Sequence, residues 1–469
     1  MTDLFSWGVD SLMASRIRSG VHRTLYTGDQ ILPNNVVFEK PSIARFSQYI
    51  FDLQEGKETK DSGDSDPHRL MENLVEKYGN FGPASNIRQL KRATTGKNGK
   101  TIGLTGLTGS LGSWLLYQLG RHPTGTVDKI VCLVRAENDE AATQRIKDNM
   151  AQRQIEFDVQ NPKLEIRAAD LTKRDLGLTV PVYSSLVKEV DMFIHAAWPV
   201  HFGSSLVSFE DNIKETDQPR FYYCSSLASV LGRPFSDGII LERISDEPST
   251  ASPIGYSQSK WVTEKICRHA SERGSLDGNA ELRVHVLRVG QLCGDTNLGH
   301  WNEKEGWPLL IRTAQTTGCL PLLADKPSWL PVDLAARAII EMVIGDQDQG
   351  RHSNQAEDLF IRHIVHPITI EWSAVLDDLQ AAGLIFERVT PQVWLGRVEA
   401  SSDDDPSKQM LPIWRAAYGD RYDDHADLDI KVDSKIAQAG SNTLRTIQAI
   451  DFSQIERMVL AWRRTGFLR

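Results

Sequence analysis

A tyrosine and a lysine stand four residues apart in Tyr256-Ser257-Gln258-Ser259-Lys260. On a helix this spacing places both side chains on one face. A free tyrosine has a pKa of about 10, and a cation close by favours the phenolate and lowers that pKa. The tyrosine could then exchange a proton near neutral pH, as general acid–base catalysis requires. The alternative is a chance match on an exposed helix face.

A serine completes this candidate catalytic set. Ser226 ends the β-rich run that contains Cys224 and Ser225. A hydroxyl at the carboxyl end of a parallel strand faces the ligand crevice of an open α/β sheet. We therefore expect Ser226 to donate a hydrogen bond to a substrate carbonyl oxygen beside Tyr256, with Lys260 as the third catalytic residue.

A glycine-rich turn predicts where a cofactor binds. The segment Gly106-Leu107-Thr108-Gly109-Ser110-Leu111-Gly112 follows a β-rich run and opens a helical one. In dinucleotide sites such glycines allow a tight turn, close approach of the backbone to a pyrophosphate, and tight helix–strand packing. Glycines also serve ordinary turns, but the strand–turn–helix context favours the cofactor. The predicted cofactor-binding residues here are Gly106, Thr108, Gly109, Ser110, Leu111 and Gly112.

Two residues at later strand ends bear on which cofactor binds. NAD enzymes of this type usually carry an acidic residue after the second strand, to bind the ribose 2′-hydroxyl. Arg135 stands there instead, and it would pair with a 2′-phosphate, so we expect NADPH. The alternative is a solvated surface arginine. Asp170, which precedes Leu171 after the third strand, could accept from the adenine amino group or simply cap the strand end.

The elements that must position these residues alternate between strand and helix. Strands are predicted over 101–105, 129–135, 164–169, 192–197, 221–225 and 284–289, and helices over 110–120, 137–153 and 256–273. This alternation predicts an α/β fold with a Rossmann-type, doubly wound parallel sheet. Beyond Gly290 the alternation weakens, and most tryptophans lie there. We expect a smaller mixed substrate lobe in which these tryptophans are core residues.

Composition limits the other classes of function. The chain has 469 residues, 40% of them hydrophobic and 25% charged, and a formal net charge of -9. No apolar run is long enough to span a membrane, no secretory signal is recognised, and the charge argues against a nucleic-acid partner. The five cysteines show no CxxC spacing, so we expect reduced thiols in a cytoplasmic protein and no metal site.

The order of glycine turn, serine and YxxxK resembles that of the extended short-chain dehydrogenase/reductases. Further segments are similar to the thioester reductase domains of fungal nonribosomal-peptide-synthetase-like enzymes, carboxylic acid reductases and aminoadipate reductases. These segments are His195-Ala196-Ala197-Trp198-Pro199-Val200, Arg288-Val289-Gly290-Gln291-Leu292-Cys293-Gly294-Asp295, Trp329-Leu330-Pro331-Val332-Asp333, and Trp462-Arg463-Arg464-Thr465-Gly466-Phe467-Leu468. The resemblance covers roughly residues 100–469. It adds Leu171, Ala196, Ala197, Tyr256 and Lys260 to the expected cofactor site.

The N-terminal region resembles a carrier domain. Gly8-Val9-Asp10-Ser11-Leu12 is similar to the motif whose serine receives phosphopantetheine in acyl and peptidyl carriers. Taken alone, it is a helix start with Asp10 or Ser11 as N-cap. The expected domains are a truncated all-α carrier remnant over 1–51, a flexible linker over 52–67 and a reductase over 68–469. The reductase divides into an NADP-binding core over about 98–295 and the substrate lobe over about 296–469.

Two segments depart from the family pattern. Ser11 lies only ten residues from Met1, so we expect the first carrier helix and the adenylation domain to be absent, as in a truncated product or an incomplete gene model. The connection over 198–219 is shorter than in related reductases. We expect it to hold a short crossover helix, at some loss of stability and activity.

The predicted function is NADPH-dependent release of an acyl thioester, held on a phosphopantetheine arm, as an aldehyde. A second reduction to the alcohol is left open, and a separate carrier or adenylation protein is a candidate partner. One alternative is an extended dehydrogenase or epimerase that acts on a free carbonyl compound or a sugar nucleotide. The other is a non-catalytic remnant of a carrier–reductase enzyme.

Overall fold

The computed structural model describes most of the chain from residue 66 onward and scattered parts before it. The described residues are 4, 17–18, 20–21, 24–25, 32, 36–40, 42–55, 66–81, 99–199, 206, 220–232, 238–276, 283–345, 359–402, 404–419 and 431–469. Ser11, residues 56–65 of the predicted linker, and nearly all of the predicted crossover segment 198–219 lie outside these ranges.

A seven-stranded parallel sheet forms the centre of the described structure, in the order β11-β7-β5-β4-β1-β2-β3. The chain runs outward from β1 in one direction through β2 and β3, and in the other through β4, β5, β7 and β11. The switch point between β1 and β4 is where such sheets bind ligands. The strands are β1 (Lys100–Thr105), β2 (Val127–Val134), β3 (Leu164–Ala168), β4 (Met192–His195), β5 (Arg220–Ser226), β7 (Arg283–Val289) and β11 (Leu359–Ile364).

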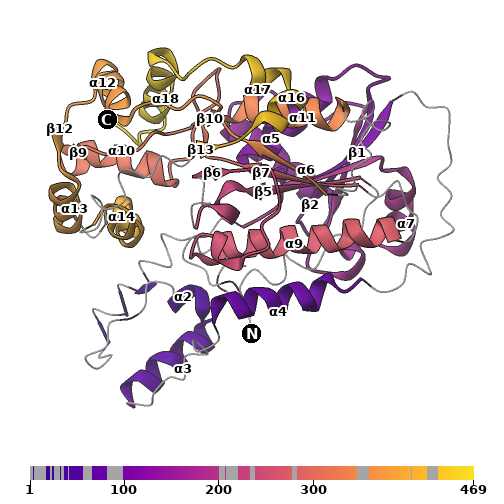
Figure 1. Cartoon of the computed structure of the whole chain (residues 1–469), viewed down its shortest axis with the longest axis horizontal. Helices are drawn as coiled ribbons and strands as arrows, with labels where there is room; N and C mark the ends of the chain where they lie inside the picture. Colours follow the sequence, from indigo (N-terminus) through magenta and orange to yellow (C-terminus); the bar gives the residue numbers. More distant parts are fainter. Residues whose placement is uncertain are drawn as a thin grey trace.

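Helices cover both faces of this sheet (Figure 1). One face packs against α5 (Ser110–Arg121), α6 (Asp139–Gln152) and α11 (Val332–Gly345) in the largest apolar cluster. The other face packs against α7 (Val180–Glu189) and α9 (Gly255–Leu276). Because both faces are covered, the central strands are largely apolar runs, and the sequence predicts every strand of this sheet except β11. The predicted α/β fold and parallel sheet are confirmed.

A second core lies beside the sheet, at the left of Figure 1. It is built by α10 (Gly306–Thr316), α12 (Trp372–Ala381), α13 (Pro391–Ala400), α14 (Leu411–Tyr418), α18 (Phe452–Arg464) and the paired strands β9 (Cys319–Pro321) and β12 (Glu387–Val389). Its buried side chains include Trp301, Trp329, Trp372, Trp394, Trp414 and Trp462. These tryptophans are core residues, as predicted.

The expected substrate lobe over 296–469 is not one continuous unit. Within that range, β11 pairs with β7 at the edge of the main sheet, and α11 packs on α5. The short helices α16 (Lys435–Gly440) and α17 (Asn442–Thr446) join this layer through Ala437 and Leu444. The chain therefore returns to the sheet after entering the second core, a long-range pairing with no local sequence signal.

Short elements complete the described part. They are the strand pairs β6 (Ile239–Ile240) with β13 (Lys431–Val432) and β8 (Leu292–Cys293) with β10 (Leu330–Pro331), and the 3-10 turns η2 (Arg174–Gly177), η4 (Leu227–Val230), η5 (Pro248–Thr250) and η6 (Pro406–Met410).

Before the sheet, three helices lie fully within the described residues. The helices α2 (Val36–Glu39) and α3 (Ile43–Gln54) share a small apolar cluster around Phe46 and Ile50. The helix α4 (Pro67–Gly79) lies alongside α9, where Met71, Leu74 and Val75 are buried against Trp261, Val262 and Ile266. The segment after the predicted linker is therefore packed on the helical layer that covers the sheet.

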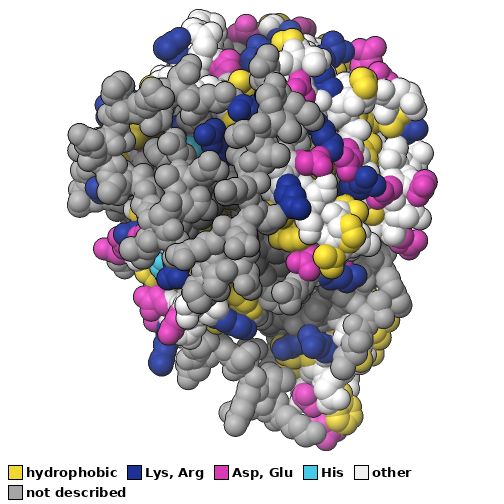
Figure 2. All heavy atoms as spheres, turned by 90° about the vertical axis from the view of Figure 1, so that its right-hand side faces the viewer, with side chains coloured by type: hydrophobic (Ala, Val, Ile, Leu, Met, Phe, Trp, Pro, Cys, Tyr) yellow, Lys and Arg dark blue, Asp and Glu magenta, His cyan; other side chains and the backbone are white. Residues whose placement is uncertain are grey.

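The described surface mixes charges of both signs. On the face in Figure 2, basic and acidic side chains are interspersed over the described atoms. No described helix combines the length and apolar character needed to cross a membrane.

Candidate functional site

The helix α9 brings Tyr256 and Lys260 to the carboxyl end of β5. Lys260 is buried, with 2% of its surface exposed, and its Nζ donates a hydrogen bond of 2.8 Å to the carbonyl oxygen of Cys224. The same Nζ lies 5.7 Å from the centre of the Tyr256 ring. The YxxxK segment therefore turns inward against the sheet, which excludes the exposed-face alternative.

Ser226 and Tyr256 meet through their side chains. Ser226 is the last residue of β5, and its hydroxyl shares a side-chain hydrogen bond with the Tyr256 phenol. The backbone N–H of Ala228 donates to the Ser226 Oγ at 3.2 Å, which orients that hydroxyl at the start of η4. All three residues predicted from the sequence thus lie together at the carboxyl edge of the sheet.

The electrostatics correct one expectation. Burial raises the pKa of Tyr256 to about 12, although the Ser226 hydrogen bond acts in the opposite direction. Burial likewise lowers the pKa of Lys260 to about 7. The expected lowering of the tyrosine pKa by Lys260 is therefore wrong for this state of the protein. The physical reason is that removal of both groups from water disfavours both charged forms.

An aromatic enclosure around Lys260 was not predicted. The Lys260 Nζ lies 4.3 Å from the centre of the Trp198 ring and 4.7 Å from that of Tyr223. The Trp198 indole N–H donates to Ser259 Oγ at 3.3 Å, and Ser259 donates to the carbonyl oxygen of Tyr256 at 2.6 Å. Ring faces stabilise a nearby cation, so Trp198 holds the lysine and the helix turn that carries the tyrosine. Its only sequence signal was its place in the His195–Val200 segment.

The glycine turn lies between β1 and α5, as predicted. Gly106 has a φ of +76°, and a Cβ there would lie 2.5 Å from the carbonyl carbon of Ala196. A Cβ at Gly112 would collide with the carbonyl oxygen of Gly106. Only glycine satisfies both constraints. The Ala197 N–H donates to Thr105 Oγ1 at 3.3 Å, so the loop after β4 is held beside the turn.

This turn fits a dinucleotide. Gly109 is the N-cap of α5 and provides no side-chain cap, so the first amides of the helix remain available. The described surfaces of Thr108, Gly109, Ser110 and Leu111 are at least partly exposed. Free amides and the helix dipole at such an N-terminus stabilise a phosphate.

Two arginines converge beyond the end of β2. Arg135 is exposed, and its carbonyl oxygen accepts a hydrogen bond from the guanidinium of Arg145 on α6. Burial, together with the charge of Arg135, lowers the pKa of Arg145. Sequence reasoning found Arg135 and missed Arg145, whose position depends on how α6 returns to the sheet. Two neighbouring cations favour a bound anion.

Asp170 adopts the geometry of a turn cap. Its Oδ1 accepts from the N–H and the hydroxyl of Thr172 at 3.1 and 2.7 Å, and Lys173 lies 3.2 Å from Oδ2. The Thr172 hydrogen bond is the main cause that lowers the Asp170 pKa. The adenine role of Asp170 and the cofactor contact of Leu171 therefore stay predictions, and the Asp170 contacts favour the capping alternative.

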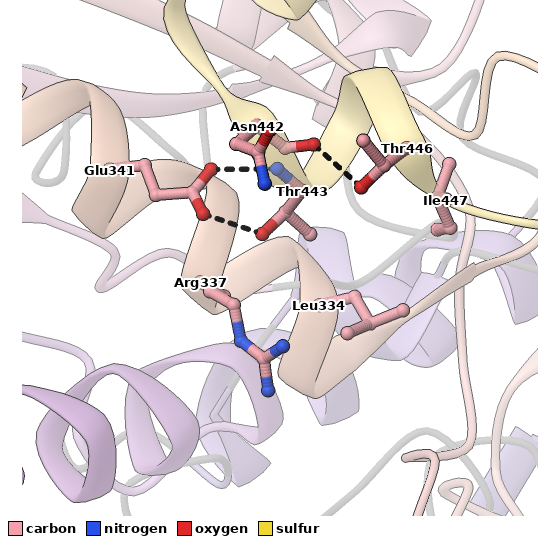
Figure 3. A pocket seen from close by; sticks show the side chains of 7 residues that line it. All are labelled: Leu334, Arg337, Glu341, Asn442, Thr443, Thr446 and Ile447. Carbon is pink, nitrogen blue, oxygen red and sulfur yellow. Dashed lines mark hydrogen bonds between the residues drawn. The ribbon is translucent and has the colours of Figure 1, made fainter.

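A cavity lies elsewhere, between α11 and α17 (Figure 3). Its volume is about 210 Å³, it opens to solvent, and none of the predicted site residues lines it. Glu341 points across it and accepts from the Thr443 N–H and hydroxyl at 2.9 and 2.7 Å, which caps α17. The cavity is thus a packing gap between α11 and α17, bridged by hydrogen bonds to Glu341. Its lining residues are Leu334, Arg337, Glu341, Asn442, Thr443, Thr446 and Ile447.

The sheet, the glycine turn and the grouped serine, tyrosine and lysine define an extended short-chain dehydrogenase/reductase. Residues 104–339 match the family model described as male sterility protein, an NAD-binding domain. The chain belongs to this family, and its site takes a nicotinamide cofactor.

Curated relatives agree with this family. An adenylate-forming reductase of Aspergillus terreus is 27% identical over 100% of this chain and 43% of its own length. A carboxylic acid reductase of Neurospora crassa is 29% identical over 86% of this chain and 38% of its own length. The chain thus spans less than half of these relatives.

Solved structures show the same fold. The terminal R domain of the myxalamid PKS-NRPS pathway superposes with a TM-score of 0.67 at 23% identity, covering 86% of this chain and 99% of that one. A thiolation-reductase di-domain of an archaeal non-ribosomal peptide synthetase gives a TM-score of 0.59 at 16% identity, covering 99% and 93%.

Proposed function

We propose that this chain reduces a carrier-bound acyl thioester with NADPH and releases the acyl group as an aldehyde. The observation that carries the proposal is the side-chain hydrogen bond between Ser226 and Tyr256 at the carboxyl edge of β5, beside the buried Lys260. Two hydroxyl donors side by side suit an oxygen that gains negative charge. The curated relatives named as adenylate-forming and carboxylic acid reductases support the same chemistry.

Each residue has a defined task. When bound, the reduced nicotinamide supplies a hydride to the thioester carbonyl carbon. Ser226 and Tyr256 hydrogen-bond the oxygen on which charge develops, and Tyr256 transfers a proton to it. Lys260, held by Trp198 and the Cys224 carbonyl, provides a positive charge behind the phenol and would contact the nicotinamide ribose.

The cofactor is NADPH in this proposal. Arg135 and Arg145 would pair with the 2′-phosphate, and the first amides of α5 with the pyrophosphate. Arginine–phosphate pairs combine charge attraction with directed hydrogen bonds. NADH has a 2′-hydroxyl in place of the 2′-phosphate, so it cannot form such a pair.

The N-terminal region would itself contribute the carrier segment that holds the acyl group. We propose Ser11 as the phosphopantetheine attachment site, supported by its motif and by the fold match that extends over a thiolation–reductase pair. The packing of α4 on α9 supports a tether that starts next to the catalytic helix. The buried, free cysteines among the described residues fit a reducing cytoplasm.

Turnover of a synthetic thioester tests the function. The purified chain is mixed with an acyl-pantetheine thioester and NADPH, and the aldehyde and the free thiol are quantified separately. We expect equal amounts of both, and an initial rate of aldehyde formation about a hundredfold lower with Tyr256→Phe. Reduction of free carbonyl compounds without any thioester turnover would favour a dehydrogenase instead. NADPH binding without turnover of either substrate would favour a non-catalytic remnant.

Modification of the carrier is a separate measurement. Incubation with coenzyme A and a phosphopantetheinyl transferase, followed by intact-mass analysis, should show a phosphopantetheine adduct that Ser11→Ala loses. An unmodified chain would contradict the carrier role and leave the reductase proposal intact.

A further inference from the structure

A carboxyl group at the start of α10, in the second core, is held by two side-chain hydrogen bonds. Glu305 precedes α10, and its Oε2 accepts from the Trp301 indole N–H at 3.0 Å and from the Gln291 amide at 3.3 Å. Its other oxygen, Oε1, has no donor among the described residues. One oxygen is therefore fixed and the other is available.

The topology places this carboxyl at the reaction edge of the sheet. Val289, at the end of β7, is the register partner of Ser226. Gln291 follows two residues later and holds Glu305 at that edge. Burial is the main cause that raises the pKa of Tyr256, and the negative charge of Glu305 adds to it, so the carboxyl lies within electrostatic range of the phenol.

Glu305 is suited to carry a proton. Burial raises its pKa from the ordinary carboxyl range to about 7, against the two hydrogen bonds that act to lower it. The titratable groups that its charge reaches are Tyr256 on α9 and the Cys293 thiol on β8, and no described lysine or arginine pairs with it. Glu305 is half-buried: the raised pKa comes from the part that is withdrawn from water, and the exposed part allows the proton to exchange with solvent.

We propose, on the basis of the function proposed above, that Glu305 is the general acid that protonates the departing sulfur of the thioester. Reduction of the carbonyl leaves a hemithioacetal. As it collapses, the C–S bond breaks, the sulfur takes the bonding electron pair, and the carbonyl double bond re-forms.

Two protons move in this collapse. The proton on the oxygen returns to Tyr256, and the Glu305 proton goes to the sulfur. Glu305 regains its proton from solvent, so thioester, hydride and one proton give aldehyde and thiol. Tyr256 gives a proton to the oxygen in the reduction and recovers it in the collapse, so it supplies no net proton. The proton that ends on the thiol must therefore come from a second donor.

The leaving group provides a kinetic test. Glu305→Gln keeps the shape of the side chain and removes the acid. Glu303→Gln is the control: it makes the same change two residues away, at a carboxylate that the Thr465 hydroxyl contacts. General acids contribute roughly a hundredfold or more to rate. We expect Glu305→Gln to lower turnover of an acyl-pantetheine thioester about a hundredfold. The loss should be under about tenfold with an aryl thioester, whose more acidic thiol leaves without help. Glu303→Gln should match the unmutated chain.

An NMR titration gives a readout other than turnover. With 15N-labelled tryptophan, the Trp301 indole signal, assigned with Trp301→Phe, should shift with a midpoint near pH 7. Glu305→Gln should abolish that shift. A midpoint at about 4.3, the ordinary glutamate value, would overturn the proton-donor role.

The outcomes separate the two proposals. Equal losses with both thioesters would show that Glu305 only positions the substrate, and unchanged turnover would make it a bystander. Both results overturn this inference while the unmutated chain still reduces thioesters. If the unmutated chain reduces neither thioester, the proposed function itself fails.

Discussion

The Arg288 guanidinium on β7 donates hydrogen bonds to both carboxylate oxygens of Glu264 on α9. Nη2 lies 2.6 Å from Oε2, and Nε lies 3.1 Å from each oxygen. The side chains are 0% and 1% exposed. The hydroxyls of Ser225 and Ser229, on either side of Ser226, donate to the same carboxylate. The pair therefore ties α9, which carries Tyr256 and Lys260, to the end of β5, which carries Ser226.

Removal of one partner of this ion pair should destabilise the fold strongly. Glu264→Leu leaves the guanidinium buried without its counter-charge, at a cost of about 3–5 kcal/mol in the free energy of unfolding. The double variant Glu264→Leu/Arg288→Met should recover much of that loss. Urea denaturation measures both. As a control, Glu272→Gln on the exposed side of α9 should change stability by less than about 0.5 kcal/mol. A Glu264→Leu variant as stable as this control would contradict the argument.

The grouping of the candidate catalytic residues could be predicted from the sequence because local patterns encode it. Tyr256 and Lys260 share one helix, Ser226 ends a strong apolar strand, and the glycines mark one turn. These features need no knowledge of distant contacts. The parallel sheet follows from the same alternation of apolar runs.

The residues that the sequence did not reveal depend on tertiary packing. Arg145 reaches Arg135 because of the orientation of α6, and Glu305 comes to Gln291, just beyond the end of β7, from the second core. β11 pairs with β7 although about 70 residues separate them along the chain. The Tyr256 pKa could not be predicted either, because the depth of burial, and not the spacing of the lysine, decides its direction.

Loss of the phenol should separate chemistry from binding. Tyr256→Phe keeps the ring that faces Lys260 and removes the proton donor, so turnover should fall about a hundredfold or more. The cofactor dissociation constant should stay within about threefold, because the phenol would not hold the phosphates. Single-turnover kinetics and cofactor fluorescence measure the two quantities. Ser226→Ala should show the same pattern with a smaller loss, and unchanged turnover in Tyr256→Phe would exclude it as the acid.

Buried Lys260 should make stability depend on pH. Its pKa is lowered to about 7 in the folded chain and is about 10.5 when unfolded. Between these values the unfolded state binds more protons, so the contribution of Lys260 to stability rises with pH across this window. Below about pH 7 both states are protonated, and the full cost of burying the charge remains. Lys260→Met should therefore raise the melting temperature at pH 6 more than at pH 10, while abolishing turnover. An equal change at both pH values would show that the lysine is not strained by burial.

The arginine pair should set the preference for NADPH. Arg135→Ala and Arg145→Ala each remove a cation beside the proposed 2′-phosphate position. A charge-assisted hydrogen bond contributes roughly 1.5–3 kcal/mol, so each change should weaken NADPH binding about tenfold or more. NADH binding should be nearly unaffected, since it lacks the phosphate. Isothermal titration calorimetry with both cofactors measures the ratio of the NADH to the NADPH dissociation constant. Arg121→Ala, at the other end of α5, is the matched control, because the Arg121 guanidinium pairs with exposed Glu156. Equal affinity of the unmutated chain for NADPH and NADH would contradict the assignment of both arginines. If only Arg135→Ala weakens NADPH binding, Arg145 is a structural residue that holds the Arg135 carbonyl.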